Sequence, residues 1–424
     1  MSDVAGAAHG LYRAVFGGEP EWGYRAPGRV NLIGDHTDYN GGACLPIAID
    51  RVCVAVSGPG EVSGSRQGMQ GAAIERGRAC VIDPACDELV QASSSAGTPA
   101  PGWARYVREV ARGLMNTARE RGTAMRRVSL AFAGDVPIGA GLSSSAALEI
   151  SVCGALEQAW GIELTKRDRV LLCWKAEHRA GVPCGQMDQT ASVYGEAGRA
   201  VLIGAAGEPA LIPMPRRDQA SILVANTKVR HELGDGAYRH LVEGCRGAAV
   251  KLGVESLCLA DPSAVEDGAC GLTDRERRLS RHAVREHRRA LRAAELMVEM
   301  ALVNRTGSRS AASGTERVGD TAWRTALGLL GGLMLESHRS LRDDYRVSCE
   351  ELDMLVEVAM NSEGAYGARM TGAGFGGCIV ALVQPGAVRT VEERLIDGFR
   401  RRHGRECDVM VVTASGGAGP VGMT

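Results

Sequence analysis

The chain has 424 residues, with 49 lysines and arginines against 50 aspartates and glutamates, so its net charge is −1. This balance argues against a protein that binds nucleic acid or a membrane surface through bulk positive charge. Hydrophobic residues make up 45% of the chain, which excludes overall disorder, and the length suits two or three domains.

The sequence carries none of the usual marks of a membrane or secreted protein. No apolar run is long enough for a transmembrane helix, and the first ten residues have neither the basic nor the apolar part of a secretory signal. The 13 cysteines include no Cys-x-x-Cys and no zinc-like cluster with histidine. Several, such as Cys53 and Cys378, lie in apolar stretches. We therefore expect reduced core cysteines in a cytoplasmic protein that contacts no membrane and no nucleic acid.

Hydrophobic periodicity predicts a mixture of strands and helices. In chain order, the pattern predicts a strand at Cys44–Val56, a helix at Tyr106–Thr117, a strand at Val128–Ala133, helices at Ser144–Trp160 and Thr165–His178, strands at Ala200–Ile203 and Ser221–Ala225, helices at Tyr238–Leu252, Arg275–Leu302 and Ser348–Met360, and strands at Cys378–Val383 and Asp408–Thr413. Such a mixture indicates α+β or α/β domains.

Three stretches without periodicity, rich in small or polar residues, are predicted to be surface loops: Ser57–Ala73, Gln91–Gly102 and Asn304–Asp320. The last interrupts a helical region. Glycine and proline separate two strand signals between residues 205 and 215. We expect a domain boundary there, which divides the chain into residues 1–210 and 211–424.

The strongest local signal is GDVPIGAGLSSSAALE, residues Gly134–Glu149, between a predicted strand and a predicted helix. Gly139 and Gly141 let the backbone approach an anion closely, and the serines of Ser143–Ser145 open the helix. Free N–H groups at a helix N-terminus attract phosphate, and a serine hydroxyl there can bind phosphate-linked Mg²⁺. A plain turn with a serine cap needs only one glycine and one serine, so anion binding is favoured.

A second segment, RAPGRVNLIGDHTDYNGG, is dense in polar groups. Arg29, Asp35, His36 and Asp38 lie within ten residues, and aspartate with histidine offers hydrogen bonds that suit the hydroxyls of a sugar. Taken singly, the histidine fits a buried residue with its own partner and the aspartates fit turn positions. This segment alone names no ligand.

Two further stretches are informative only in combination. GARMTGAGFGGCIVALV, Gly367–Val383, concentrates five glycines before a strand, which indicates positive φ, close backbone approach or a tight hairpin. In KAEHRAGVPCGQMDQTAS, Asp188 follows Gly185 and a predicted helix that carries Glu177. A single aspartate is usually a cap or a surface residue.

Together, these segments resemble the GHMP small-molecule kinase superfamily and, within it, the galactokinases. RAPGRVNLIGDHTDYNGG is similar to the galactokinase signature, PIGAGLSSSAALE to the ATP-phosphate loop, CGQMDQ to the catalytic-aspartate segment and ARMTGAGFGGCIVALV to the third motif. The motifs occur in the expected order over nearly the whole chain. The resemblance implies a two-domain α+β GHMP kinase fold: an N-terminal domain like domain 2 of ribosomal protein S5, a C-terminal ferredoxin-like α+β domain, and an active site in the cleft.

The same resemblance implies transfer of the ATP γ-phosphoryl group to the anomeric hydroxyl of galactose, giving α-D-galactose 1-phosphate. Asp188 is then the proton acceptor or an orienting group, and Arg29 stabilises the moving charge. Mg²⁺ is held by Ser145 and Glu177. The implied ATP-binding residues are Gly139, Ala140, Gly141, Leu142, Ser143, Ser144 and Ser145, with Trp103 near adenine. The implied sugar-binding residues are Asp35, His36, Thr37, Asp38, Gly185 and Tyr238. A monomer or weak homodimer acting on small molecules is expected.

Several positions depart from the galactokinase pattern. Asp35 replaces a glutamate, Gln186 replaces a small or apolar residue, and Leu241 replaces an arginine. The segment from Glu177 to Asp188 is one residue shorter than usual, and 304–320 is an extra insertion. These departures leave open an anomeric kinase for N-acetylgalactosamine, galacturonate or arabinose. A non-catalytic sugar and ATP sensor is disfavoured, because the serine-rich loop, Asp188 and Arg29 are all present.

Overall fold

The computed structural model describes residues 4–60, 77–85, 88–91, 102–204, 207–230, 234–267, 271–307 and 318–422. Most of the expected loop residues, 61–73, 92–101 and 308–317, lie outside this described part. Where the ends of those loops are described, part of the expectation is wrong, because 57–59, 304–307 and 318–320 belong to a strand and two helices.

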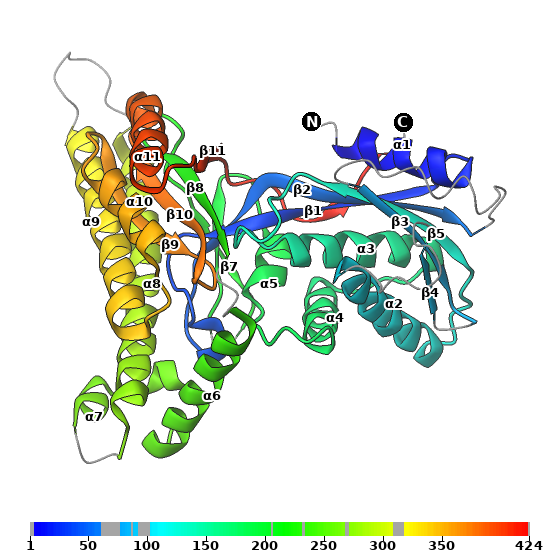
Figure 1. The fold of residues 1–424 in the computed structure, drawn as a ribbon, viewed down its shortest axis with the longest axis horizontal. Helices are drawn as coiled ribbons and strands as arrows, with labels where there is room; N and C mark the ends of the chain where they lie inside the picture. The colour runs from blue at the N-terminus through cyan, green and yellow to red at the C-terminus, as the bar shows by residue number, and fades with distance from the viewer. Residues whose placement is uncertain are drawn as a thin grey trace.

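A six-stranded antiparallel sheet forms the first half of the molecule. Its order is β12 (Gly419–Pro420), β1 (Trp22–Asn31), β2 (Pro46–Pro59), β5 (Val128–Gly134), β3 (Gly77–Asp83) and β4 (Glu88–Gln91). Helix α1 (Val4–Phe16) covers one face, and α2 (Gly102–Glu120) and α3 (Ser144–Trp160) cover the other (Figure 1). Along β2, Val52, Val54 and Val56 pack with α1, whereas Cys53 and Ala55 join the core on the α3 side. This alternation is that of a strand buried on both faces.

Short elements connect this sheet to the second half. Helices α4 (Lys166–Arg179) and α5 (Met187–Tyr194) follow α3, and then come a two-stranded hairpin and a further helical segment. The hairpin is β6 (Arg199–Leu202) with β7 (Ala210–Pro213), and the helical segment contains α6 (Gly234–Leu252), the turn η3 (Leu257–Leu259) and α7 (Pro262–Glu266).

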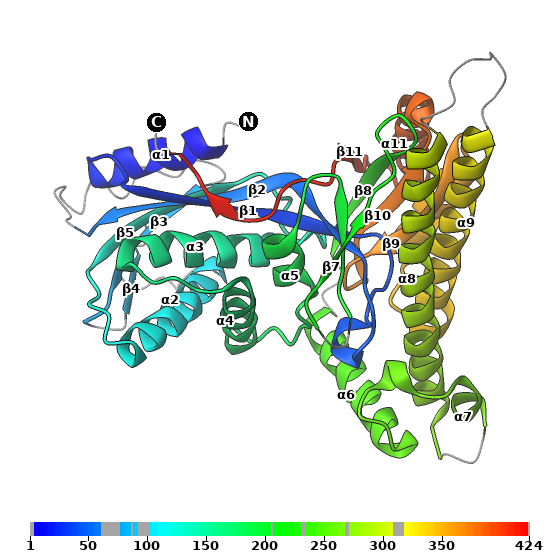
Figure 2. The same cartoon turned by 180° about the vertical axis from the view of Figure 1, so that it is seen from behind.

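The second sheet has the order β11 (Asp408–Val412), β8 (Ser221–Arg230), β10 (Gly376–Val383) and β9 (Ala365–Thr371), with antiparallel neighbours. Numbered along the chain, the strands lie in the order 4-1-3-2, and helices separate the first strand from the second and the third from the fourth. This is the expected ferredoxin-like arrangement. The helices are α8 (Asp274–Gly307), α9 (Val318–Ser340), α10 (Glu350–Met360) and α11 (Val388–His403). Figure 2 shows α8 and α9 as a long antiparallel pair.

The two halves are interwoven at the end of the chain. Strand β12 returns to the first sheet and pairs with β1, with Tyr24 opposite Pro420, so the two termini lie close together (Figure 1). The boundary expected at 210 falls inside β7. It remains a prediction.

All twelve predicted elements are present, Ser144–Trp160 with the predicted ends and the others with shifted ends, but the pattern missed several others. The most consequential is β1, where Arg25, Pro27, Gly28 and Arg29 break the apolar alternation of a strand.

In the described part of the chain, no helix is both long and apolar enough to cross a membrane. Eleven cysteines lie in the described residues, and all are free thiols, nine of them buried, as expected for reduced core residues.

Candidate active site

The glycine–serine loop, Gly139–Ser145, connects β5 to the N-terminus of α3. Gly139, Gly141 and Ser143 all have positive φ, at 68°, 74° and 60°. Ser143 precedes α3 without capping it, and its buried hydroxyl has no hydrogen-bond partner among the described residues. Open helix-terminal N–H groups beside an unpaired hydroxyl form a site for an anion.

The third glycine-rich segment packs on this loop backbone to backbone. It forms the hairpin turn between β9 and β10. A Cβ on Gly372 would lie 3.1 Å from the Gly141 carbonyl oxygen, and a Cβ on Gly377 would lie 3.1 Å from that of Ala140. The glycines therefore serve both a hairpin and a close approach, two of the three possibilities that their density indicated.

Arg29 and Asp188 meet beside the glycine–serine loop. A register shift in the pairing of β1 with β2 falls between Pro27 and Arg29, and a Cβ on Gly28 would lie 2.7 Å from the Leu142 carbonyl oxygen. This close approach brings the buried Arg29 to the first turn of α5, where its Nε donates to Asp188 Oδ1 at 2.8 Å. Arg29 Nη1 also donates to the Gly141 carbonyl. One arginine thus ties the anion loop to the aspartate.

Buried carboxylates gather behind this pair. The Ser145 hydroxyl donates to Glu177 Oε1 at 2.9 Å, and Gln189 Nε2 donates to Glu177 and, at 3.2 Å, to Glu149. Burial raises the pKa of Glu177, with the charge of Asp188 adding to the effect, and burial raises that of Glu149 well above its usual value. Oε1 of Glu149 has no partner among the described residues. A bound cation would relieve this concentration of acids. Sequence analysis did not single out Glu149 or Gln189.

An inner cavity of about 250 Å³ opens next to Arg29 and Asp188. Its walls come from the N-terminal segment, the Glu177–Asp188 segment, α6 and the β9–β10 turn. The lining includes Arg29, Asp35, His36, Asp38, Glu177, Gly185, Asp188, Tyr238 and Gly372–Phe375. Most of the residues that sequence analysis assigned to catalysis and sugar binding are therefore brought together around one cavity.

Asp38 forms one wall of this cavity, at the start of the short turn η1 (Asp38–Asn40). Its Oδ2 accepts a hydrogen bond from the Met187 backbone at 3.4 Å, and a Cβ on Gly185 would lie only 1.8 Å from the same oxygen. A side chain at 185 would therefore displace the Asp38 carboxylate. Burial, with Asp188 nearby, raises the pKa of Asp38 to about 6.

His36 belongs to an aromatic cluster on the cavity wall. Its ring lies 4.7 Å from that of Tyr345 and 5.8 Å from that of Tyr238, and its Nδ1 is 2.8 Å from the Tyr39 hydroxyl. Burial lowers the pKa of His36 to about 4, so the ring is neutral near pH 7. Tyr345 ends a π-helical turn, Leu341–Tyr345, a local widening that is common at functional sites. Sequence analysis did not single out Tyr345 or Tyr39.

Asp35 lines the cavity but is already paired. Its carboxylate forms a fully buried ion pair with Arg369 of β9 and accepts a hydrogen bond from the Gly372 backbone at 3.3 Å. Arg369 was missed in the sequence. An arginine in the otherwise apolar strand AYGARMT was the available signal, because such a residue needs a buried anion.

Helix α8 supports the N-terminal loop, here residues 34–43, from behind. Glu286 accepts from the Gly34 backbone at 2.9 Å, His287 accepts from the Ala43 backbone at 2.9 Å, and His282 Nε2 lies 3.1 Å from the Asp35 carbonyl oxygen. Burial opposes ionisation of Glu286, but Arg289, His282, Arg369 and the Ser337 hydroxyl together outweigh it and lower the pKa to about 2. Nothing local in the sequence marks these three residues as partners of a loop more than 200 positions away.

Two assignments need separate treatment. The buried hydroxyl of Thr37 lies 2.8 Å from both the Gly34 and Ala43 carbonyl oxygens and does not line the inner cavity, so its sugar contact remains a prediction. Its role is to close the loop. Trp103 begins α2 and packs edge-on against Phe132 at 5.2 Å, and its indole nitrogen is buried without a partner in the described residues. Its place near adenine remains a prediction.

The positions at which the sequence differs from the galactokinase pattern can also be located in the structure. Leu241 is buried in the core around the second sheet and does not line the inner cavity. Gln186 lines a larger, neighbouring cavity instead. The shortened segment still brings Glu177 to Ser145. Of the three substitutions, only Asp35 lies on the wall of the inner cavity.

Comparison with known proteins agrees with this geometry. Residues 10–59 match the family described as the galactokinase galactose-binding signature, 105–196 match the GHMP kinases N terminal domain, and 323–401 match the GHMP kinases C terminal domain. Galactokinase from Bos taurus is 37% identical over 401 residues, covering 94% of this chain and 92% of the relative. Galactokinase from Streptomyces coelicolor is 36% identical, covering 93% of each.

Solved structures give the same result. The crystal structure of Lactococcus lactis galactokinase complexed with galactose matches with a TM-score of 0.79 and 25% identity, covering 98% of this chain and 100% of that chain. Mevalonate kinase from L. major matches with a TM-score of 0.55 and 16% identity, covering 94% and 98%, which shows the shared fold alone. With an α+β fold, three matched family segments and full-length relatives above 30% identity, the chain belongs to the galactokinase family of GHMP kinases.

Proposed function

We propose that the cleft transfers the γ-phosphoryl group of ATP to the anomeric hydroxyl of galactose, giving α-D-galactose 1-phosphate. As a member of its family, the chain is an ATP-dependent sugar kinase. The observation that carries the assignment to this cleft is the Arg29–Asp188 pair, which stands between the glycine–serine loop and the inner cavity. Phosphoryl transfer requires the acceptor hydroxyl and the phosphate to meet at such a boundary.

On the nucleotide side, we assign the ATP phosphates to Gly139–Ser145. The unpaired Ser143 hydroxyl and the N-terminus of α3, which no side chain caps, support this assignment. We assign Mg²⁺ to Ser145 and Glu177. Among the described residues, no three potential ligands form a complete metal site. Such a sparse set fits Mg²⁺, which binds one or two protein ligands together with substrate phosphates and water. When bound, the ion neutralises phosphate charge.

On the acceptor side, we assign Asp188 to the anomeric hydroxyl. Its carboxylate holds the hydroxyl by accepting its proton in a hydrogen bond, and takes up that proton as the oxygen bonds to phosphorus. Arg29 orients the carboxylate through its hydrogen bond and offers positive charge as negative charge shifts toward the transferred group. A carboxylate is a weaker base than the alkoxide that it would release, so proton transfer falls late, after most of the new bond has formed.

We assign the remaining sugar hydroxyls to Asp38, the neutral His36 ring, Tyr238 and the open surface at Gly185. All four residues line the inner cavity, which supports this assignment. His36 Nε2 supports it as well, because no described residue makes a hydrogen bond of normal geometry with it. Asp35 contributes through its pair with Arg369, which holds the wall next to the sugar.

Three coarser expectations complete the proposal. We place the enzyme in the cytoplasm, where ATP is available and thiols stay reduced. We expect it to act as a monomer or a weak homodimer. The division into residues 1–210 and 211–424 is kept as a working boundary for the two domains, with the last strand of the chain crossing back to the first domain.

The test is ADP release from Mg-ATP across a panel of galactose, glucose, N-acetylgalactosamine, galacturonate, arabinose and talose, with Asp188→Asn as the blank. We expect strong turnover on galactose and weak turnover on the others. Preference for another sugar would overturn the substrate and keep the kinase chemistry. Silence across the panel, with sugar binding retained, would overturn catalysis and favour a sensor.

A further inference from the structure

A chain of hydrogen bonds runs through the aromatic cluster beside the inner cavity, and the proposed reaction does not account for it. His36 Nδ1 lies 2.8 Å from the Tyr39 hydroxyl, and that hydroxyl lies 2.7 Å from the hydroxyl of Tyr345. The Tyr345 hydroxyl lies 3.1 Å from the Cys245 sulfur. Asn40 Nδ2 donates to the Cys245 sulfur at 3.6 Å and to the His36 carbonyl oxygen at 2.7 Å. The chain thus begins and ends at His36.

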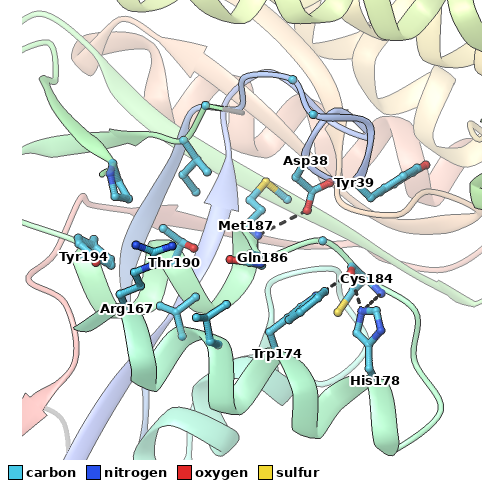
Figure 3. Close-up of a pocket in the computed structure, with 18 of the residues that line it drawn as sticks. Asp38, Tyr39, Arg167, Trp174, His178, Cys184, Gln186, Met187, Thr190 and Tyr194 are labelled. Carbon is cyan, nitrogen blue, oxygen red and sulfur yellow. Dashed lines mark hydrogen bonds between the residues drawn. The ribbon is translucent and has the colours of Figure 1, made fainter. Parts of the chain in front are cut away.

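Three segments that are distant in sequence meet in this chain. The N-terminal loop contributes three of its members, α6 contributes Cys245, and the π-helical turn before α10 contributes Tyr345. Figure 3 shows Tyr39 next to Asp38 on the N-terminal loop, with its ring directed away from the Asp38 carboxylate. The loop therefore presents the Asp38 carboxylate and the Tyr39 hydroxyl in different directions, and only the hydroxyl belongs to the chain.

The direction of the protons follows from the two ends of the chain. At one end, the Asn40 amide nitrogen can only donate, so the Cys245 sulfur already accepts one hydrogen bond. A thiol sulfur is a weak acceptor, and burial raises the pKa of the Cys245 thiol, so this group keeps a proton to donate. At the other end, the unprotonated nitrogen of a neutral imidazole is a good acceptor. The protons accordingly point from Cys245 through Tyr345 and Tyr39 to His36 Nδ1.

This direction determines which nitrogen of the His36 ring carries a proton. Burial lowers the pKa of His36 to about 4, so the ring is neutral near pH 7 and has one N–H group. Because Nδ1 accepts from Tyr39, that N–H group is at Nε2. His36 lines the inner cavity, and its buried Nε2 makes no hydrogen bond of normal geometry with any described residue. An N–H group in this position is free to donate to a ligand.

A donor at this position suits a sugar, because the inner cavity is rich in acceptors. The carboxylates of Asp35, Asp38 and Asp188 all line it. The guanidinium of Arg29 is already bonded to Asp188 and to the glycine–serine loop. A sugar hydroxyl that donates its proton to a carboxylate still needs a donor for its oxygen, and such linked hydrogen bonds strengthen one another. With its proton on Nδ1 instead, His36 would add one more acceptor to this wall.

We propose that Tyr39 and Tyr345 are positioning residues that hold His36 in the tautomer with its proton on Nε2, so that the ring donates a hydrogen bond to one hydroxyl of the sugar. Tyr39 acts directly, by donating to Nδ1. Tyr345 acts through Tyr39, because its donated proton prevents the Tyr39 hydroxyl from turning its own proton away from His36. The inference rests on the proposed function, since it requires the sugar to bind in the inner cavity.

The first test reads the tautomer without turnover. Long-range proton–nitrogen NMR on protein with isotope-labelled histidine distinguishes a protonated from an unprotonated ring nitrogen, and His36→Gln identifies the signal of this residue among the nine histidines. In the natural chain at pH 7 we expect the proton on Nε2. In Tyr39→Phe, where Nδ1 loses its donor, both tautomers should be populated. A proton on Nδ1 in the natural chain, or an unchanged tautomer in Tyr39→Phe, would overturn the proposal.

The second test is steady-state kinetics. Tyr39→Phe keeps the ring but removes the donor to Nδ1, so the Michaelis constant for galactose should rise roughly tenfold, with a much smaller change in turnover at saturating galactose. Tyr345→Phe leaves Tyr39 able to donate, so the rise should be only about two- to threefold. Tyr12→Phe, which removes a buried hydroxyl between α1 and the first sheet, is the matched control and leaves the Michaelis constant for galactose unchanged. An unchanged Michaelis constant for galactose in Tyr39→Phe would overturn the proposal.

A third measurement separates this role from a general loosening of the site. Calorimetry compares the natural chain with Tyr39→Phe in binding galactose analogues that each lack one hydroxyl other than the anomeric one. The analogue without the hydroxyl that His36 contacts should bind both proteins equally, whereas the others should bind the variant roughly tenfold more weakly. An equal loss for every analogue would indicate a structural role and overturn the proposal. A chain that binds the sugars in the expected way but phosphorylates none would contradict the proposed function alone.

Discussion

The two sides of the active site are built in different ways. On the nucleotide side, Gly139–Ser145 is one continuous segment whose glycines and serines create the anion site locally. On the sugar side, the N-terminal loop depends on Glu286 of α8 and on Arg369 of β9, which lie some 250 and 330 positions further along the chain. The first side is specified by local sequence and the second by the assembled fold, so mutations far from the N-terminal loop should alter sugar binding before they alter nucleotide binding.

The largest effect is expected at the junction of the two sides. Asp188→Asn keeps the shape of the side chain but removes the charge that accepts the anomeric proton, so turnover falls by about 10²–10⁴-fold. Affinity for sugar and nucleotide stays within a few-fold. Turnover from initial rates, with calorimetric binding of galactose as the control, separates the two effects. Natural turnover in this variant would remove Asp188 from the chemistry.

The next effect tests the sugar side from a distance. Glu286→Gln leaves Arg289 without its buried anion, and breaking such a pair costs about 3 kcal/mol or more. The Michaelis constant for galactose should rise roughly tenfold, while that for ATP stays the same. Urea unfolding and steady-state kinetics measure the two quantities. Glu299→Gln, on an exposed face of the same helix, is the control. Equal changes in both Michaelis constants would mean that α8 supports the whole site.

The pH dependence of unfolding sharpens this prediction. The pKa of Glu286 in the folded protein, about 2, lies below the ordinary value of 4.5. Its stabilising contribution is therefore complete above about pH 4.5 and is lost as the pH falls toward 2. The gap in unfolding free energy between the natural chain and Glu286→Gln should narrow over that interval.

The contrast also explains how much the sequence predicted. The phosphate loop follows from one contiguous pattern, whereas the roles of Arg29 and Asp188 and the ferredoxin-like half were implied by the resemblance to the galactokinases. Strand β1 was missed because its functional residues disturb the alternation that identifies a strand. Arg369, Glu286 and Tyr345 were missed because each acts through a partner distant in sequence, and no local pattern shows which residues a fold will bring together. Thr37 differs from its neighbours in the motif, because they line the cavity and it does not.

On the nucleotide side, Glu177→Gln tests the metal assignment. The amide keeps the hydrogen bond from Ser145 but loses the charge that attracts Mg²⁺. The Mg²⁺ concentration for half-maximal turnover should rise roughly tenfold or more, and part of the turnover should return at high Mg²⁺. Glu149→Gln, one helix away in the same buried cluster, should change stability more than the Mg²⁺ requirement. An unchanged Mg²⁺ requirement in Glu177→Gln would contradict the assignment.

A smaller effect is expected from the protonation of Asp38. Burial raises its pKa to about 6, so the carboxylate is protonated below that pH and ionised above it. Only the ionised form accepts hydrogen bonds with both oxygens, so the Michaelis constant for galactose should fall several-fold between about pH 5 and pH 7. His36, with its pKa near 4, stays neutral over this range and does not contribute. In Asp38→Asn the Michaelis constant should be higher and flat with pH, whereas an unchanged slope would point to another group.

The smallest effect is expected at Asp35, where the chain departs from the usual glutamate. Its carboxylate is buried against Arg369, and the inner cavity lies on its other side. Asp35→Glu adds one methylene, which moves the carboxylate toward the cavity without removing its charge from the arginine. The Michaelis constant for galactose should therefore fall by about threefold, since a single hydrogen bond contributes about 0.5–1.5 kcal/mol. Asp35→Asn, which removes the charge from a buried pair, is the matched control and should lose stability instead. An unchanged Michaelis constant in Asp35→Glu, with stability retained, would mean that this carboxylate makes no hydrogen bond with the sugar. Its contribution would then be the ion pair with Arg369, which forms this part of the cavity wall.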